Sequence, residues 1–287
     1  MKFVGWYFKH QAGEKSLAVI PGRASDEAFV LIITDNKSYH ISYPLSEYQY
    51  HKEHNRKSFR VQVGSNIFTP VGISLDIRRP ELTLSGEIEY KNLTPIKNDI
   101  MGPFRFFPME CRHGIISMEH SLRGIITLNG DAHDYSGGKG YIESDSGRSF
   151  PRGYTWVHCN DFERNCSIMA AIAHIPFYGL KFWGCICVVM LDGREYRLAT
   201  YKGAKIQRCE RGVIELIQGK YRLQINIDEH NGQLLSAPRS GKMDRLIRET
   251  LSAPARFIFS KGEHCLFEGE SMNASYEYMM CTYEEML

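Results

Sequence analysis

Apolar and polar residues alternate along most of the chain, with the period of β-strands that bury one face. Turn sequences such as Asp35-Asn36, Asn129-Gly130-Asp131 and Asp192-Gly193 interrupt this alternation at short intervals. Many short strands spaced in this way indicate sandwiches or barrels, in contrast to alternating βαβ units. We therefore predict an all-β fold. The predicted strands are Phe29–Ile33, Arg60–Val63, Gly114–Met118, Gly124–Leu128, Trp183–Leu191, Tyr221–Ile227 and Arg256–Phe259.

Two short segments have features of helices instead. From Ser240 to Leu251, apolar residues recur at helical spacing behind a serine that can cap a helix. Residues Leu45–His54 form a second candidate. The sequence thus predicts one or two short helices in an otherwise all-β chain.

A Gly-rich run, residues 136–140, lies near the middle of the chain. Such runs mark connections between structured parts. A chain of 287 residues is long enough for one large domain or two ordinary ones. We expect two domains shaped like β-barrels or sandwiches, residues 1–135 and 139–287, and the second carries the motif described next.

Residues 140–160 concentrate carboxylates, aromatic rings and other functional side chains. Glu143 and Asp145 are two positions apart, so they share one side of an extended strand. Two carboxylates on a wall of low dielectric repel each other, and burial can then raise the pKa of one into the range of a general acid. The structural alternative is that Asp145 caps the Asp-Ser-Gly turn while Glu143 pairs with Arg148 or Arg152.

The segment that follows has two unlike faces if it is extended. One face is aromatic and polar, and it is suited to lining a ligand cavity. The other is small and apolar. In the alternative reading, the small face forms the core and the aromatic face packs against another element. The aromatic face consists of Tyr154, Trp156, His158 and Asn160, and the small face of Thr155, Val157 and Cys159.

These residues belong to a longer motif: Tyr141 and Glu143, Asp145-Ser146-Gly147, Phe150-Pro151 and Trp156-x-x-Cys159-Asn160-x-Phe162. The motif resembles the signature of the tocopherol cyclase family. Gly5–Lys9, Leu235–Pro238 and Ser271-Met272 resemble the two ends of the family sequence, so the resemblance extends over nearly the whole chain. The family usually has Trp at the position of Ser146 and Gln at the position of His158.

The resemblance implies two lipocalin-like barrels and a redox-neutral reaction, without metal or cofactor, that closes a prenyl-quinol to a chromanol. A carboxylic acid protonates the prenyl double bond, aromatic faces stabilise the carbocation, and the phenolic oxygen attacks it. Glu143 is the first candidate for the acid and Asp145 the second. The candidate ligand-binding residues are Tyr141, Arg148, Phe150, Tyr154, Trp156, His158 and Asn160.

Two alternatives stay open. One is a lipocalin-like protein that binds a hydrophobic ligand without transforming it, and the other is a hydratase of an isoprenoid double bond. In each case the expected partner is a lipophilic small molecule, a prenyl-quinol or an isoprenoid. No metal site is predicted, because His113, His120 and His133 show no ligand spacing.

Charge and composition narrow the remaining classes of partner and cellular location. A net charge of +2 spread over the chain gives no reason to expect a nucleic-acid partner. No signal peptide or transmembrane segment is recognisable, and the eight cysteines lack the spacing of a disulfide framework. We therefore expect a cytoplasmic protein with reduced thiols, in which peripheral membrane contact is possible. The oligomeric state is not predicted.

Overall fold

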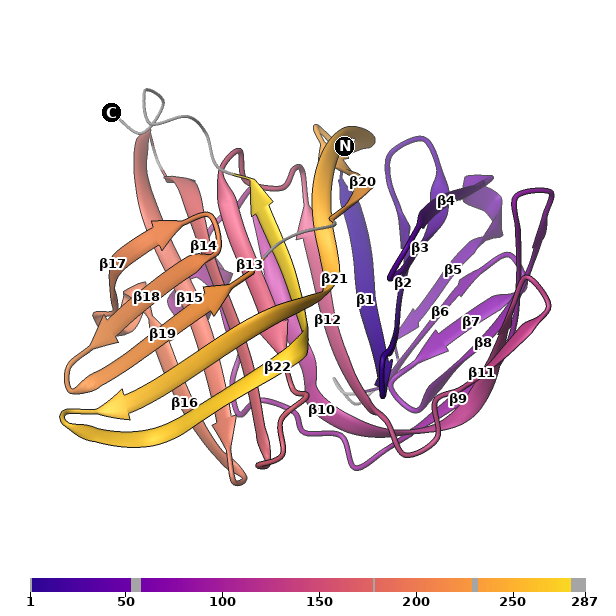
Figure 1. Cartoon of the computed structure of the whole chain (residues 1–287). Coiled ribbons are helices and arrows are strands. Elements are labelled where there is room, and N and C mark those ends of the chain that lie inside the picture. The colour runs from indigo at the N-terminus through magenta and orange to yellow at the C-terminus, as the bar shows by residue number, and fades with distance from the viewer. Residues whose placement is uncertain (1, 53–57, 178, 229–231, 280–287) are drawn as a thin grey trace. The chain divides into compact units, whose positions relative to one another are not determined.

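The computed structural model describes residues 2–279 except 53–57, 178 and 229–231. Within these ranges, every regular element is a β-strand or a short 3-10 turn, and the strands form two antiparallel sheets (Figure 1). The predicted all-β class is therefore confirmed. None of the described segments forms a helix long and apolar enough to cross a membrane.

The first sheet has twelve strands in the order β4-β3-β2-β1-β12-β10-β9-β8-β7-β6-β5, with β11 paired to β10. Most neighbours in this sheet are consecutive in the chain, whereas β12 is inserted between β1 and β10. The strands are β1 Phe3–Ala12, β2 Lys15–Arg23, β3 Ala28–Thr34, β4 Ser38–Tyr43, β5 Tyr48–Lys52, β6 Phe59–Val63, β7 Asn66–Thr69, β8 Gly72–Arg79, β9 Leu82–Lys91, β10 Cys111–Leu128, β11 Asp131–Asp134 and β12 Lys139–Gly147.

Alternate residues of the first sheet share one apolar core. Phe8, Val19, Ile32, Phe68 and Ile142, from five different strands, are completely buried in it. Strands β2 and β3 also lie against β6, although these strands are far apart in the sheet order. The sheet therefore curls around its core, and every second residue of β1 and β12 is left on the opposite face.

The second sheet has ten strands in the order β16-β15-β14-β13-β22-β21-β19-β18-β17, with β20 paired to β21. Its end strands also approach one another, because β15 lies against β17. The strands are β13 Tyr154–Cys159, β14 Cys166–Phe177, β15 Leu180–Leu191, β16 Arg194–Ala199, β17 Lys205–Glu210, β18 Val213–Gln218, β19 Tyr221–Ile227, β20 Gln233–Arg239, β21 Lys242–Lys261 and β22 His264–Met279.

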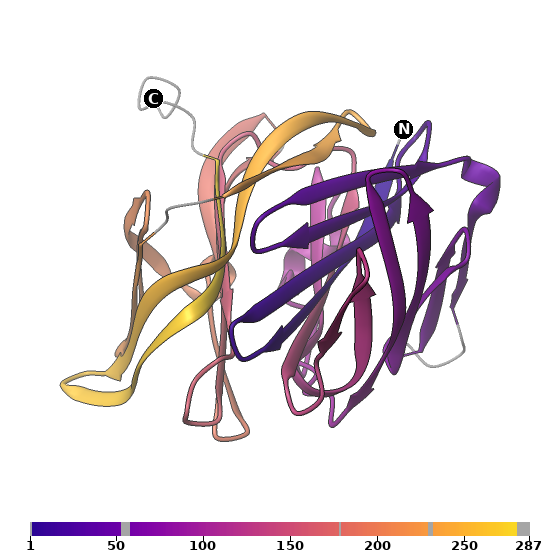
Figure 2. The ribbon, with the colours of Figure 1, turned by 45° about the vertical axis from the view of Figure 1, so that its right-hand side comes forward.

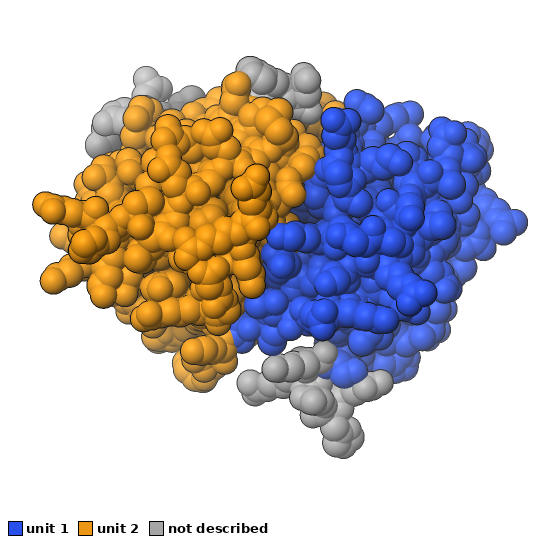
Figure 3. All heavy atoms as spheres, turned by 60° about the horizontal axis from the view of Figure 1, so that its bottom comes forward, with its two compact units in different colours: residues 1–96, 113–149, 235–245 blue, residues 97–112, 150–234, 246–287 orange. Residues whose placement is uncertain are grey.

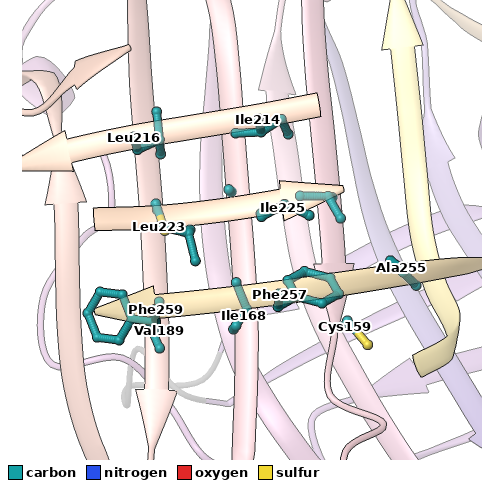
Figure 4. Close-up of a cluster of buried hydrophobic side chains, with 14 of the residues drawn as sticks. Cys159, Ile168, Val189, Ile214, Leu216, Leu223, Ile225, Ala255, Phe257 and Phe259 are labelled. Atoms are coloured by element: carbon teal, nitrogen blue, oxygen red, sulfur yellow. The ribbon is translucent and has the colours of Figure 1, made fainter. Parts of the chain in front are cut away.

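A separate apolar core lies inside the second sheet. In Figure 4, β18, β19 and β21 cross over β13, β14 and β15, and side chains from the two layers meet between them. Phe257 and Phe259 pack there with Cys159, Ile168 and Val189. The long pair β21–β22 bends strongly along its length (Figure 2). Its register shifts between Thr250 and Ala255 are irregularities of the kind that bend antiparallel strands.

The chain divides into two compact units, coloured in Figure 3. The first unit comprises residues 1–96, 113–149 and 235–245, and the second comprises residues 97–112, 150–234 and 246–287. The Gly-rich run of residues 136–140 lies between β11 and β12, which both belong to the first sheet. The chain passes from the first sheet to the second after Gly147, and not at that run.

Both helix predictions are wrong. Residues from Ser240 to Leu251 form the turn before β21 and the first half of that strand. Leu246, which a buried helix face would cover, is 61% exposed. Residues Leu45–Glu47 form a single 3-10 turn, η1, and β5 follows directly. The last two positions of that predicted helix, 53 and 54, lie outside the described residues. Two further 3-10 turns are η2 Gly102–Phe106 and η3 Thr200–Lys202.

Candidate active site

Strand β12 places Tyr141 and Glu143 on the face of the first sheet opposite its apolar core. Ile142, between them, lies in that core, and successive residues of a strand point to opposite faces. In the β1–β12 pair, Tyr7 lies opposite Glu143 and Lys9 lies opposite Tyr141. All four side chains are buried. This face therefore carries polar and ionisable groups that are removed from bulk water.

A chain of polar contacts runs through the Glu143 carboxyl group. The Tyr141 phenol donates a hydrogen bond to Oε2 of Glu143 at 2.5 Å. Nε2 of His113, on β10, lies 3.3 Å from the same oxygen. The other ring nitrogen of His113, Nδ1, lies 3.1 Å from Oδ1 of Asp145. The structure thus brings the predicted residues Tyr141, Glu143 and Asp145 together, and it adds an imidazole between the two carboxyl groups.

The positions of the protons follow from these contacts. Burial, followed by the charge of Glu143, raises the pKa of Tyr141 well above its usual value, so the phenol keeps the proton that it donates. The Asp145 carboxylate accepts the Nδ1 proton of His113, which fixes the ring tautomer. Nε2 then lies 3.3 Å from Oε2 of Glu143. A buried carboxyl group of this kind can deliver a proton and recover it through the imidazole.

An aromatic surface adjoins these groups. The rings of Tyr7 and Tyr141 meet edge to face, with their centres 6.5 Å apart and their planes at 65°. Aromatic faces carry partial negative charge and attract a cation within about 6 Å of the ring centre. Two such rings beside a proton donor suit a reaction that passes through a carbocation.

Strand β13 carries the other predicted residues, in the second unit. Val157 and Cys159 lie in the core of that unit, so Trp156 and His158 lie on the opposite face. The His158 ring stacks on Trp156 with ring centres 6.4 Å apart, and its Nε2 lies 3.4 Å from Oγ of Ser167. The strand therefore has the two faces that its alternation predicts.

Two glutamates share this aromatic face. The Tyr154 phenol donates a hydrogen bond to Oε2 of Glu277 at 2.5 Å. Glu277 on β22 lies opposite Trp156 on β13 and opposite Glu249 on β21. Residues directly opposite in antiparallel strands point to the same face. An indole, a phenol and two carboxyl groups, one of them completely buried at Glu249, are thus neighbours in the second unit.

Comparison with known families identifies the chain. A family model described as tocopherol cyclase-like matches residues 83–278, which include both groups of residues described above except Tyr7 and Lys9 of β1. The chain belongs to the tocopherol cyclase-like family. The resemblance that the motif indicates is therefore confirmed at the level of the family. No curated protein matches the chain.

Solved structures share the fold of this family member. A Nitrosomonas europaea protein assigned as an AttH superposes with a TM-score of 0.56 at 12% identity, covering 98% of this chain and 93% of that one. Kievitone hydratase from Nectria haematococca superposes with a TM-score of 0.53 at 10% identity, covering 97% and 89% of the two chains. At such low identity the likeness shows the fold alone, and it confirms the predicted lipocalin-like architecture.

His113, Glu143 and Asp145 also have the composition of a metal-binding set. One ligand atom from each residue lies within 4.8 Å of the other two. However, the two nitrogens of the imidazole face different carboxyl groups, whereas an imidazole ligates an ion through one nitrogen. As arranged here, the imidazole lies between the two carboxyl groups, with a hydrogen-bond contact to Asp145 and a distance of 3.3 Å to Glu143.

The remaining predicted ligand-binding residues differ in their exposure. Arg148 follows β12 in a bend and is exposed, and its carbonyl oxygen accepts a hydrogen bond from the N–H of Gly241 at 2.6 Å. Phe150 is half-buried and packs edge to face on Tyr154, with ring centres 5.9 Å apart. Asn160 is buried directly after β13.

Sequence reasoning missed five residues of these two groups: Tyr7, Lys9, His113, Glu249 and Glu277. His113 stands next to a correctly predicted strand, but only the pairing of β10 with β12 brings it to Glu143. Glu249 lies in the segment wrongly predicted as a helix. The Glu143 group belongs to the first unit and the Trp156 group to the second, so the two groups are built independently.

Proposed function

We propose that this protein is an acid catalyst that protonates a double bond of a prenylated, lipophilic substrate and closes a prenyl-quinol to a chromanol. The observation that carries this proposal is the chain of contacts from Tyr141 through Glu143 and His113 to Asp145. Membership of the tocopherol cyclase-like family supports the reaction class. The substrate and the ring closure are our inference from the chemistry of this site.

The proposed reaction conserves atoms and electrons. Glu143 donates a proton to the less substituted carbon of the prenyl double bond, which leaves a tertiary carbocation. The faces of Tyr7 and Tyr141 stabilise that cation. The phenolic oxygen of the quinol then attacks it, and the proton released by that oxygen returns to the Glu143–His113 pair. One proton enters and one leaves, so no oxidant or reductant is consumed.

The roles of the three residues around Glu143 follow from their positions. Tyr141 holds Oε2 of Glu143 by its hydrogen bond, which orients the carboxyl group. His113 exchanges a proton with the same oxygen. Asp145 is a positioning residue, because it acts on the substrate only through the His113 ring. A carboxylate–imidazole–carboxyl sequence of this kind fixes the ring and stabilises its charged form, as acid–base sites require.

We also propose that the aromatic face of β13 binds ligand. Trp156 offers an indole surface, and His158 and Asn160 are buried polar groups that can hold a hydroxyl group. Their burial and their mixture of aromatic and polar chemistry support this role.

Hydration of an isoprenoid double bond is the second candidate function. It needs the same proton donor, with water in place of the phenolic oxygen as the nucleophile. The likeness of the fold to kievitone hydratase favours keeping this alternative. The two reactions differ in product mass, because ring closure gives an isomer of the substrate and hydration adds one water.

The test uses Glu143→Gln with geranyl hydroquinone as the probe. Glutamine keeps the size of the side chain and can accept the Tyr141 hydrogen bond, but it cannot donate a carboxyl proton. We expect turnover to fall at least about 100-fold, with the Kd for the probe changed less than about threefold. Glu87→Gln, an exposed carboxylate of the first sheet, is the matched control and keeps wild-type turnover. Wild-type turnover by Glu143→Gln would remove Glu143 from the mechanism.

A further inference from the structure

Three segments of the second unit carry exposed basic residues and one strongly exposed aromatic side chain. They are residues 100–109, 181–183 and 200–205, and we call them the aromatic-basic surface. Phe106, at the end of η2, is 74% exposed, which is the highest exposure of any large apolar side chain among the described residues. A phenylalanine with so large an exposed fraction indicates an interaction site when its surroundings also have the composition of one.

The exposure of Phe106 is built into the local structure. Its neighbour Phe104 packs in the opposite direction, with its ring centre 6.1 Å from that of Phe182 and 6.4 Å from that of Tyr201. The Tyr201 hydroxyl donates a hydrogen bond to the carbonyl oxygen of Ile100 at 2.9 Å. These contacts hold η2 and the residues before it, while Phe106 stays exposed at the end of η2.

Each of the three segments carries exposed basic residues. The guanidinium group of Arg105 lies over the Phe106 ring, 4.5 Å from its centre. Lys181, Lys202 and Lys205 in the other two segments are exposed. The three segments contain no Asp or Glu, and Asp99, just before them, accepts a hydrogen bond from the N–H of Met101. The aromatic-basic surface therefore carries positive charge beside exposed apolar area.

We propose that the aromatic-basic surface docks this protein on an anionic phospholipid bilayer. Aromatic side chains with neighbouring Lys and Arg are favoured at the boundary between headgroups and acyl chains, where the ring is desolvated and the cations meet lipid phosphates. Each cation near an anionic surface contributes roughly a fivefold gain in binding. The excess of positive charge favours an anionic bilayer over a purely apolar partner.

This inference goes beyond the proposed function and rests on different residues. It also fits that function, because a prenylated substrate partitions into bilayers and a docked enzyme meets it there. Binding to vesicles without substrate tests the surface alone. Glu143→Gln, which removes the proposed acid, should therefore bind vesicles as the wild type does.

The experiment is co-sedimentation of the full chain with vesicles of phosphatidylcholine, with and without phosphatidylglycerol. We expect binding to the vesicles that contain phosphatidylglycerol, and weaker binding as salt rises. Phe106→Ser should weaken that binding about tenfold, and Arg105→Gln about fivefold. Val71→Ser is the matched control, because Val71 is 69% exposed in the first unit and lies outside the surface. It should bind as the wild type does.

Three results would overturn the proposal. The first is that the wild type stays in solution with both kinds of vesicle. The second is that Phe106→Ser binds vesicles as well as the wild type does, and the third is that Val71→Ser loses as much binding as Phe106→Ser. A different result would be that neither the wild type nor Phe106→Ser binds vesicles, while the wild type self-associates in sedimentation and Phe106→Ser is monomeric. In that case the aromatic-basic surface binds a second copy of this chain, and not a bilayer. Circular dichroism confirms that each variant is folded, which is expected because the side chains are exposed.

Discussion

The imidazole of His113 is the residue on which the proposed chemistry depends most closely, because its two nitrogens contact the two carboxyl groups that the sequence singles out. Two carboxylates alone on a strand face would repel one another. With the ring between them, each carboxyl group faces a different ring nitrogen. On this difference in contacts we propose Glu143 as the acid and Asp145 as a positioning residue.

The first prediction concerns Asp145. Asp145→Asn keeps an oxygen that accepts the Nδ1 proton of His113, but it removes the charge that stabilises the protonated ring. We expect kcat to fall about 10- to 100-fold with KM nearly unchanged, and the pH profile of kcat to shift, because the imidazole titrates in a different electrostatic environment. Steady-state kinetics across a pH series measure both effects.

Ser144→Ala is the matched control for that variant, because Ser144 lies between the two carboxylates on the strand and points to the other face. It should keep the wild-type kcat and pH profile. An Asp145→Asn variant whose kcat and pH profile are unchanged would contradict the positioning role.

Two further histidines are predicted to make stability depend on pH. His10 donates from Nδ1 to the carbonyl oxygen of Leu17 at 3.1 Å, so its Nε2 accepts the Tyr90 hydroxyl proton at 2.6 Å. Burial lowers the pKa of His10 to about 4. Burial, followed by the charge of His10, lowers the pKa of His120 to about 3. Both rings are therefore neutral in the folded protein at neutral pH.

The sign of the effect follows from proton binding. Unfolded histidine has a pKa of about 6.5, so between pH 6.5 and about 4 the unfolded chain binds more protons than the folded one. Stability is then full above about pH 6.5 and falls as the pH is lowered. Each ring costs about 2 kcal/mol between pH 7 and pH 5. Urea unfolding at these two pH values should show the loss.

His10→Gln isolates one of these contributions. The amide can keep one hydrogen bond of the ring but cannot titrate, so the loss of stability between pH 7 and pH 5 should shrink by about 2 kcal/mol. A variant with the same pH dependence as the wild type would show that His10 does not have the lowered pKa.

At the scale of single elements, strand β12 depends on a glycine directly before its functional residues. A Cβ on Gly140 would lie 2.2 Å from Nε2 of His120, a buried ring on β10. The close approach of the two strands therefore requires glycine, and it holds Tyr141 and Glu143 at their distance from β10.

Gly140→Ala is predicted to destabilise the protein by about 1–3 kcal/mol, since overpacking in a buried site forces the neighbours apart. Turnover should fall as well, because β12 moves relative to His113. Gly5→Ala is the control: it lies on β1 opposite Asp145, and a Cβ there meets nothing closer than 3.7 Å. Denaturant unfolding compares the two. Equal stability of both variants would contradict this account of β12.

Individual strands also show which features of the fold could be predicted from the sequence. The alternation of apolar and polar residues correctly predicts that β13 has two unlike faces, and the position of Val157 and Cys159 in the core agrees with the alternative reading in which the small face forms the core. It failed from Ser240 to Leu251, because the spacing of Met243, Ile247 and Leu251 also fits a helix. Pairing of β21 with β20 and β22 decides the outcome, and no local signal encodes that pairing.

At the scale of the whole molecule, two long-range pairings decide where the chemistry lies. The pair β1–β12 brings the first strand of the chain to residues 139–147, and β13–β22 brings one of the last described strands to residues 154–158. Sequence motifs reveal the central strands, β12 and β13. Their partners Tyr7, Lys9 and Glu277 depend on register across more than a hundred residues, which a single sequence does not reveal.

The motif supports the family assignment, but it does not contain the whole candidate site. The motif from Tyr141 to Phe162 was sufficient to indicate the tocopherol cyclase-like family, and the family match confirms it. The motif does not contain His113, so the full proton-handling group becomes visible only in the folded protein.

The central claim is that the Glu143–His113 pair transfers a proton to a prenyl double bond. The most direct test is mass spectrometry of geranyl hydroquinone after incubation with the protein in D2O, followed by back-exchange in H2O. We predict an isomeric chromanol that retains one deuterium on carbon and is absent with Glu143→Gln. A product heavier by one water as well as that deuterium would indicate the hydratase. Substrate recovered unchanged and free of deuterium, although bound, would contradict catalysis and indicate a binding protein.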